Sequence, residues 1–193
     1  MKNIRKLLST LVVVCIVLSC LVACGQGGND TQPTKDVDYA GELKLDMTSE
    51  TLKVEVTVHT FIDGDTTHFN VPKDVMENGI LKARYLAINT PESTGKIEPY
   101  GKTASNFTKE KLSQATSIVI ESDTSSWNPD STGARYLVWV WYKTAQDTEY
   151  RNLNIEILQE GLAIASNSGG NIYGTVAVAA IAQAKAQKLN VHS

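Results

Sequence analysis

Apolar and polar residues alternate most regularly between residues 52 and 58, where leucine and valine occupy every second position. Successive side chains of a strand point to opposite faces, so this pattern predicts a half-buried strand. The strand leads into Asp63-Gly64, a dipeptide typical of tight hairpin turns. Residues 66 to 71 are then expected to form the return strand of a hairpin.

The rest of the chain alternates between strand and helix patterns. Further strands are expected over residues 80–88, 117–121 and 135–142, and helices over 100–115, 152–160 and 172–188. Five short strands are too few for a sandwich of two sheets. With one helix between the third and fourth strands and two at the end, they indicate a five-stranded OB-fold barrel with three helices, an α+β fold. We expect a single folded domain over residues 39–193.

The N-terminus has the pattern of an export signal. Lys2, Arg5 and Lys6 precede a 16-residue run, Leu7 to Val22, that is almost entirely apolar. Residues 1–23 are therefore predicted to be a signal peptide that is removed. A membrane-spanning anchor is the alternative, but such a helix needs roughly 20 apolar residues.

The end of this run, Leu21-Val22-Ala23-Cys24, resembles a bacterial lipobox. The resemblance implies cleavage before Cys24 and a lipid on its sulfur, which would anchor the protein to the outer face of the cell membrane. Residues 24–38 are expected to be the lipidated cysteine and a flexible linker, because the stretch from Gly25 to Lys35 contains no apolar residue.

Charge and cysteine content limit the possible functions. Cys15 and Cys20 would leave with the signal, so no disulfide is expected within the mature chain. Losing residues 1–23 leaves 15 basic and 21 acidic side chains, a net charge of −6. Tight nucleic-acid binders are usually basic. The acidity therefore argues against a non-catalytic binder more than against an enzyme, which needs only a locally positive cleft.

Asp63-Gly64-Asp65-Thr66 carries the first candidate chemistry. A carboxylate just after a turn can leave the surface of a barrel and bind a hard cation, because calcium prefers oxygen ligands. The alternative for Asp65 is a hydrogen bond that closes the turn. Asp63 suits that alternative better and is expected to orient the turn or support Asp65.

Thr90-Pro91-Glu92 is the second candidate segment. It can begin a helix, with Thr90 as the N-cap. However, Ser93-Thr94-Gly95 follows without apolar periodicity, which favours a loop. The Thr90 carbonyl can then face a metal, and Glu92 can take a proton from an attacking water. The alternative for Glu92 is a solvated loop carboxylate.

Arg84 and Arg135 are the candidate phosphate ligands. A planar guanidinium can donate two parallel hydrogen bonds to the phosphate oxygens that gain charge in a phosphoryl-transfer transition state. The alternative for both is a structural salt bridge.

Several of these segments resemble the staphylococcal nuclease family in their order and spacing. The matching segments are Asp63 to Thr66, Arg84 to Glu92, Tyr100-Gly101, Gly133 with Arg135, Gln159 to Ala163, and Lys188 to Asn190. The resemblance implies an OB-fold barrel and a calcium-dependent enzyme that hydrolyses DNA and RNA to products with a 3′-phosphate. On this basis Asp65, Asn89 and the Thr90 carbonyl would hold the calcium ion.

The chain departs from the family at three places. Asn89 stands where the family usually has a second metal-binding aspartate, which removes one negative charge from the site. Ala134 separates Gly133 from Arg135. The tyrosines that help hold the nucleotide would fall near residues 167–169, where there are none. Tyr173 and Trp127 are candidates to stack on a base instead, although each can equally be a core or surface aromatic.

The sequence therefore predicts a membrane-tethered, metal-dependent nuclease, expected to be a monomer, that acts on extracellular DNA or RNA. The alternative is a non-catalytic OB-fold lipoprotein that binds nucleic acid or another polyanion and has lost turnover through Asn89.

Overall fold

The structure is a computed structural model that describes residues 36–193. The predicted signal peptide, Cys24 and nearly all of the predicted linker lie outside the described residues. Among the helices of residues 36–193, none has the length and apolarity needed to cross a bilayer.

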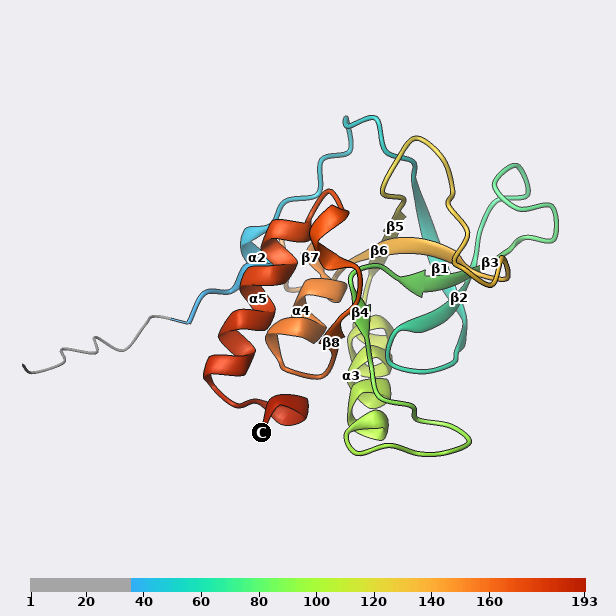
Figure 1. The fold of residues 1–193 in the computed structure, drawn as a ribbon. Coiled ribbons are helices and arrows are strands. Elements are labelled where there is room, and N and C mark those ends of the chain that lie inside the picture. The colour runs from blue at the N-terminus through green and yellow to red at the C-terminus, as the bar shows by residue number, and fades with distance from the viewer. Residues whose placement is uncertain (1–35) are drawn as a thin grey trace, which may run out of the picture. The chain divides into compact units, whose positions relative to one another are not determined.

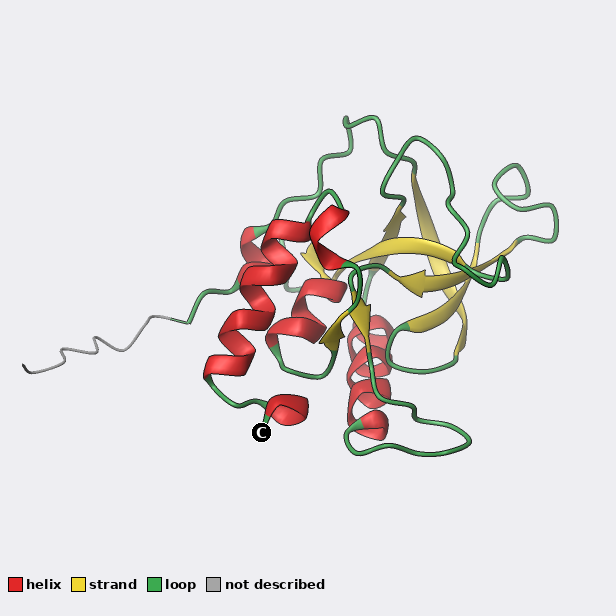
Figure 2. Ribbon diagram, viewed as in Figure 1, coloured by secondary structure: helices red, strands yellow, loops and turns green. Residues whose placement is uncertain are grey.

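Five strands form a closed barrel (Figure 2). They are β1 (Lys53–Phe61), β2 (Thr66–Asn70), β3 (Ile80–Tyr85), β5 (Ser117–Glu121) and β6 (Tyr136–Lys143). Antiparallel pairing gives the order β3-β2-β1-β5-β6, and a parallel pairing of β3 with β6 closes the barrel. The predicted five-stranded OB-fold is confirmed.

The third predicted strand is interrupted. Residues 80–88 do not form one strand, because the chain turns after β3 at Leu86-Ala87, where Ala87 has a φ of 69°. The chain then resumes as β4 (Ile88–Asn89), which pairs with β8 (Ile164–Ala165) in a separate small sheet. A two-residue strand, β7 (Arg151–Asn152), extends the edge of the main sheet beside β6.

Four α-helices pack against the barrel within the described residues, rather than the predicted three. They are α2 (Tyr39–Glu42), α3 (Gly101–Gln114), α4 (Leu153–Gln159) and α5 (Gly174–Ala186). In Figure 1, α2, α4 and α5 lie together on one side of the barrel and α3 lies beneath it. Two short 3-10 helices, Ser168–Gly170 and Asn190–His192, complete the set of helical segments.

The short α2 is the helix that the sequence did not predict. Asp38 caps it by accepting a hydrogen bond from the Gly41 N–H, and the same carboxylate pairs with Arg151 at 2.7 Å. Val37 donates its N–H to Gln183 of α5 at 3.0 Å. Residues 37 and 38 are thus held against the helices, although the sequence assigned them to the linker.

Strand β6 forms the centre of the core. Val138 to Tyr142 are all at most 1% exposed, because the barrel interior covers one face of the strand and the helices cover the other. Burying two tryptophans here removes a large apolar area from water, which is a major source of stability in a domain of this size.

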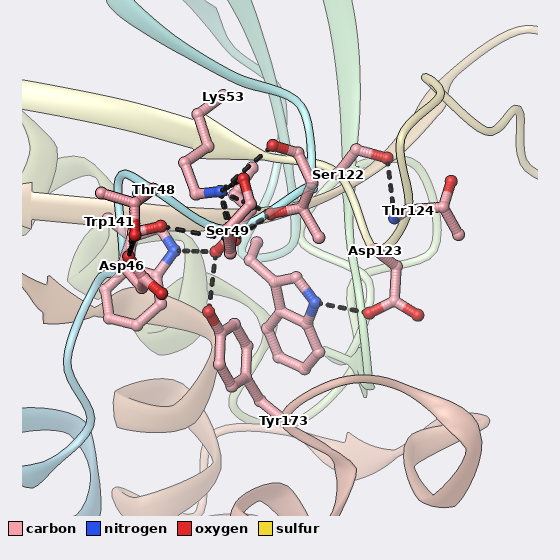
Figure 3. A network of polar contacts seen from close by, with 12 residues as sticks. Asp46, Thr48, Ser49, Lys53, Ser122, Asp123, Thr124, Trp141 and Tyr173 are labelled. Carbon is pink, nitrogen blue, oxygen red and sulfur yellow. Dashed lines mark hydrogen bonds and ion pairs between the residues drawn. The ribbon is translucent and has the colours of Figure 1, made fainter.

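A polar network joins the start of α5 to the barrel (Figure 3). The Glu121 carboxylate is fully buried and accepts hydrogen bonds from Trp141 Nε1 at 2.8 Å and from the Tyr173 hydroxyl at 3.0 Å. Lys53 lies 3.3 Å away and neutralises its charge. Breaking such a buried pair typically costs about 3–5 kcal/mol, so we infer that the network holds α5 in place.

Candidate functional site

The turn between β1 and β2 positions the candidate metal ligand. Its glycine is required by lack of space, because a Cβ on Gly64 would lie 2.8 Å from Thr90 Cγ2 and 2.9 Å from Ala104 Cβ. Thr108 of α3 donates its hydroxyl to the Gly64 carbonyl at 2.7 Å. Helix α3 therefore holds the turn tightly against the segment that carries Thr90.

The carboxylate that follows this turn lies inside the protein. Asp65 is 1% exposed, and its Oδ2 accepts a hydrogen bond from the Thr90 N–H at 2.8 Å. Its other oxygen accepts from the Thr66 hydroxyl at 3.1 Å. Asp63 closes the turn instead, by accepting from the Asp65 N–H at 3.1 Å. The two aspartates thus occupy separate positions, and the Asp65 carboxylate is buried rather than projecting from the barrel surface as expected.

Arg84 links two of the predicted metal ligands. Its guanidinium forms an ion pair with the Asp65 carboxylate and donates to the Asn89 side-chain oxygen at 2.5 Å. The side chain of Arg84 is 19% exposed, so the cation at this site is accessible from solvent. The structure thus brings Asp65, Arg84, Asn89 and Thr90 together.

The charge of Asp65 is unfavourable in this environment. Burial raises the pKa of its carboxyl to about 6, and negative Asp63 adds to this effect. Arg84 and the Thr90 N–H act in the opposite direction without restoring the ordinary value. A buried, partly compensated carboxylate in contact with an accessible arginine is typical of a functional site.

The break after β3 explains how Asn89 reaches Arg84. Asn154 of α4, which is fully buried, donates to the carbonyls of Leu86 and Val138, each at 3.0 Å. Ser168 donates its hydroxyl to the Ala87 carbonyl at 2.7 Å. These bonds hold the turn that returns Asn89 to the site. Asn154 could not be recognised from the sequence, where its only signal is an amide within an apolar helix pattern.

Glu92 begins a loop directly after the site. Its N–H donates to Glu98 Oε2 at 3.0 Å, and Glu98 returns its own N–H to the Glu92 carbonyl at 2.9 Å. The Glu92 side chain is exposed, and its carboxylate accepts no hydrogen bond from any residue that the structure describes. Glu92 lies two residues after Thr90 in the chain, which keeps it near the site.

Arg135 is not brought into contact with the other site residues. Its Nε and Nη2 both lie 2.7 Å from Asp130 Oδ2. Although burial opposes it, hydrogen bonds from Thr132 and Arg135 lower the pKa of Asp130 to about 2, so this partner stays charged. The backbone is close to the site nonetheless, because Leu137, two residues later, pairs with Arg84 across the β3–β6 ladder.

The two candidate stacking aromatics have other contacts. The Tyr173 ring packs edge-on against Trp139 and Trp141, with centroids 5.1 and 5.4 Å away. Trp127 is partly buried and packs against the core. Neither forms a hydrogen bond or aromatic contact with Asp65 or Arg84 in the described part of the chain.

A small hollow of about 130 Å³ lies beside Arg84. Its lining includes Leu137 of β6, Ile88 of β4, and Asn167 and Asn171 from the segment before α5. Asn167 lies within residues 167–169, where the family's tyrosines would fall, so this hollow offers amide groups rather than aromatic rings.

The donors at the site suit a hard cation. The Asp65 carboxylate, the Asn89 amide oxygen and the Thr90 carbonyl are all oxygen ligands of the kind calcium prefers. The set contains a single carboxylate, and in residues 36–193 no three His, Cys, Asp or Glu side chains gather as a metal cluster. The charge of the site therefore predicts weak rather than tight binding.

Two comparisons with known proteins indicate the family of this chain. Residues 82–193 match the family model described as staphylococcal nuclease homologue. The chain is also 26% identical over 162 residues to the thermonuclease of Staphylococcus intermedius, covering 82% of this chain and 80% of that protein. The family model alone covers more than half of the chain, including Arg84, Asn89, Glu92 and Arg135. This protein belongs to the staphylococcal nuclease family.

Proposed function

We propose that this protein hydrolyses phosphodiester bonds of DNA or RNA with the help of a divalent cation. One observation carries the proposal: an accessible arginine bridges a buried carboxylate and an amide oxygen, beside a loop that bears an exposed glutamate. Membership of a nuclease family supports the same conclusion.

Arg84 would bind the phosphate to be cleaved. Its guanidinium is partly exposed, and it can donate two parallel hydrogen bonds to the non-bridging phosphate oxygens. These oxygens gain negative charge as the attacking water approaches phosphorus, so the same bonds strengthen in the transition state. Arg135 can add a second cation if its side chain turns away from Asp130.

Glu92 would act as the general base. Its carboxylate is exposed, so it is available to accept a proton from a water molecule. The water oxygen forms a bond to phosphorus, the bond from phosphorus to the leaving sugar oxygen breaks, and that oxygen takes a proton from solvent. In the family this chemistry leaves a 3′-phosphate, which is the product we expect here.

Asp65, Asn89 and the Thr90 carbonyl would hold the cation, for which we propose calcium. When bound, the ion would neutralise phosphate charge and supply an acidified water. Asp65 is the only formal negative charge among these three ligands, and it already interacts with Arg84. We therefore expect the affinity for calcium to be modest and the choice among divalent cations to be broad.

We further propose that the protein acts outside the cell, anchored by a lipid on Cys24. The support is the lipobox-like sequence before Cys24 and the apolar run that precedes it. Metabolic labelling with a radioactive fatty acid tests this, since Cys24→Ser should abolish both the label and membrane retention. Retention of the label in Cys24→Ser would contradict the anchor.

A second candidate function is binding without turnover. It is favoured by Asn89, which leaves the site one negative charge short, and by the bonds that Arg84 makes to both side-chain ligands. On this view the protein would hold a polyanion and release it unchanged.

One assay separates the two functions. The purified full-length protein is incubated with single-stranded DNA or RNA in Ca²⁺, Mn²⁺ or Mg²⁺, beside Glu92→Gln, Asn89→Asp and the matched control Glu110→Gln, an exposed carboxylate on α3. We expect cleavage by the wild type and by Glu110→Gln, and a large loss in Glu92→Gln. Cleavage by Asn89→Asp alone would support the binding function instead.

A further inference from the structure

A second and larger groove lies on the other side of Arg84 from the hollow at Asn167. Its volume is about 650 Å³, and it is lined by Ile80 and Lys82 of β3, by residues 76–78 of the loop before β3, and by Ala134 and Tyr136 at the start of β6. None of the proposed catalytic or metal-binding residues lines this groove, although Ala134 and Tyr136 flank Arg135.

The groove is continuous with the candidate site along one pair of strands. Ile80, Lys82 and Arg84 alternate with buried Leu81, Ala83 and Tyr85, so the first three point outward from the barrel. Lys82 and Arg84 are two residues apart, which is roughly 6.6 Å along a strand.

The parallel β3–β6 ladder brings the start of β6 beside this part of β3. Paired residues face the same way, so Leu137 faces outward with Arg84, whereas Tyr136 shares the orientation of Ala83 and joins the groove lining as the first residue of β6. Leu137, in the smaller hollow, pairs with Arg84, and Tyr136, in the larger groove, pairs with Ala83. The two concave regions therefore follow each other along the same ladder, with Arg84 between them.

The groove has the chemistry of a site for one nucleotide. Lys82 is exposed and can contact a phosphate. Tyr136 packs partly against the core and also lines the groove, so it is the aromatic residue available to a base there. Asn78 uses its side-chain oxygen to accept from the Ile80 N–H at 3.0 Å, so its amide hydrogens are left for acceptors on a ligand. Glu77 is the acidic residue of the lining, and it opposes phosphate on the loop side. A cation next to an aromatic ring is the usual combination in grooves for single-stranded nucleic acid.

We propose that this groove binds the nucleotide next to the scissile phosphate in a single strand of DNA or RNA, with Lys82 on its phosphate and Tyr136 against its base. The inference rests on the proposed function, because it takes Arg84 as the ligand of the cleaved phosphate. Nucleotides then lie on both sides of Arg84, so the protein should prefer substrates that extend beyond the cleaved bond in both directions.

Binding without turnover tests the groove independently of catalysis. Binding of a labelled ten-nucleotide single strand is measured by fluorescence anisotropy in EDTA. The proteins are the full-length wild type, Tyr136→Leu, Tyr136→Phe and Lys82→Ala. The matched control is Lys73→Ala, because Lys73 lies in the loop before β3 but does not line the groove. We expect Tyr136→Leu to weaken binding by about 5-fold to 100-fold, the range for losing one stacked base, and Tyr136→Phe to restore it. Lys82→Ala should lower the slope of log K against log salt by about 0.7, the value for one phosphate contact on a single strand.

If both Tyr136→Leu and Lys82→Ala bind the strand with wild-type affinity and an unchanged salt slope, the proposal that this groove binds a nucleotide is wrong. This conclusion does not depend on whether the protein cleaves. If the wild type cleaves, KM supplies a second test. Lys82→Ala should raise KM for the ten-nucleotide strand more than KM for a dinucleotide, which has no phosphate beyond the scissile one. An equal rise in KM for both substrates would contradict the groove proposal. If the wild type does not cleave at all, the proposed function is wrong, and the anisotropy result alone then tests the groove proposal.

Discussion

The guanidinium of Arg84 interacts with both Asp65 and Asn89, and so joins the two side chains predicted to hold a cation. When substrate and metal bind, Arg84 would therefore exchange its contacts with Asp65 and Asn89 for contacts with the phosphate. The fork geometry of a guanidinium permits this sharing, whereas a lysine would offer only a point charge.

Replacement of Arg84 tests the phosphate contact. We expect Arg84→Lys to lower kcat by about 10²-fold to 10³-fold, the usual loss for one transition-state donor. The matched control is Arg151→Lys, because Arg151 also bridges two side chains, the carboxylates of Asp38 and Glu156, but lies beside α2 and α4. The control should lose stability and keep its kcat. Equal losses of kcat in both variants would argue that Arg84 is structural.

A single amide sets the charge of the proposed cation site. Asn89→Asp should raise calcium affinity by about 10-fold, because it adds a carboxylate ligand beside Asp65. Isothermal titration calorimetry measures the change, with Asn171→Asp as a control for added charge in the neighbouring hollow. Unchanged affinity in Asn89→Asp would exclude this position as a ligand.

The buried carboxylate predicts a particular dependence of stability on pH. The pKa of Asp65 is raised from 3.8 when unfolded to about 6 in the native protein, so the native state binds this proton more tightly. In metal-free buffer the contribution of Asp65 to stability is therefore greatest below about pH 4 and falls by up to about 3 kcal/mol as pH rises to about 6.

Urea unfolding of wild type and Asp65→Asn between pH 4 and pH 7 isolates this effect. The variant lacks the titrating group, so its free energy of unfolding should increase relative to that of the wild type as pH rises. A constant difference across this range would show that the carboxyl titrates normally. Added calcium should reduce the difference at pH 7, since a bound cation favours the ionised form.

Lack of space at the β1–β2 turn gives a prediction about packing. Gly64→Ala places a methyl group against Thr90 and Ala104, and we expect it to destabilise the protein by about 1–3 kcal/mol. It should also weaken calcium binding, because Thr90 donates to Asp65 and is a proposed ligand itself. Gly170→Ala is the control, since a Cβ there meets nothing within 4 Å. Normal stability of Gly64→Ala, measured by thermal unfolding, would contradict the close packing of this turn.

The sequence predicted the barrel well because its strands carry strong periodic patterns. Every main strand lies within about two residues of its expected bounds, apart from the longer end of β1 at Phe61 and the early end of β3 at Tyr85. The turn after β3 could not be predicted, because it depends on a left-handed alanine held by Asn154 and Ser168, which are 67 and 81 residues away. The four-residue α2 was missed because it is too short to show a period.

The candidate site was predictable where motif and local geometry coincide. Asp65 and Thr90 meet because the Asp65 carboxylate accepts the Thr90 N–H and Thr108 of α3 holds the turn at Gly64. Arg135 illustrates the limit, since its partner Asp130 is an unremarkable loop residue in the sequence. Lys82 and Tyr136 also carry no motif, and only the pairing of β3 with β6 reveals that they share a groove.

The most direct test of the proposed hydrolysis follows the oxygen of the attacking water. The full-length protein is incubated with a defined single-stranded oligonucleotide and calcium in ¹⁸O-labelled water, and the products are analysed by mass spectrometry. We predict fragments that end in a 3′-phosphate containing one ¹⁸O atom, formed with calcium and absent in EDTA. Intact oligonucleotide with every divalent cation, or fragments that carry the label on a 5′-phosphate, would contradict the account.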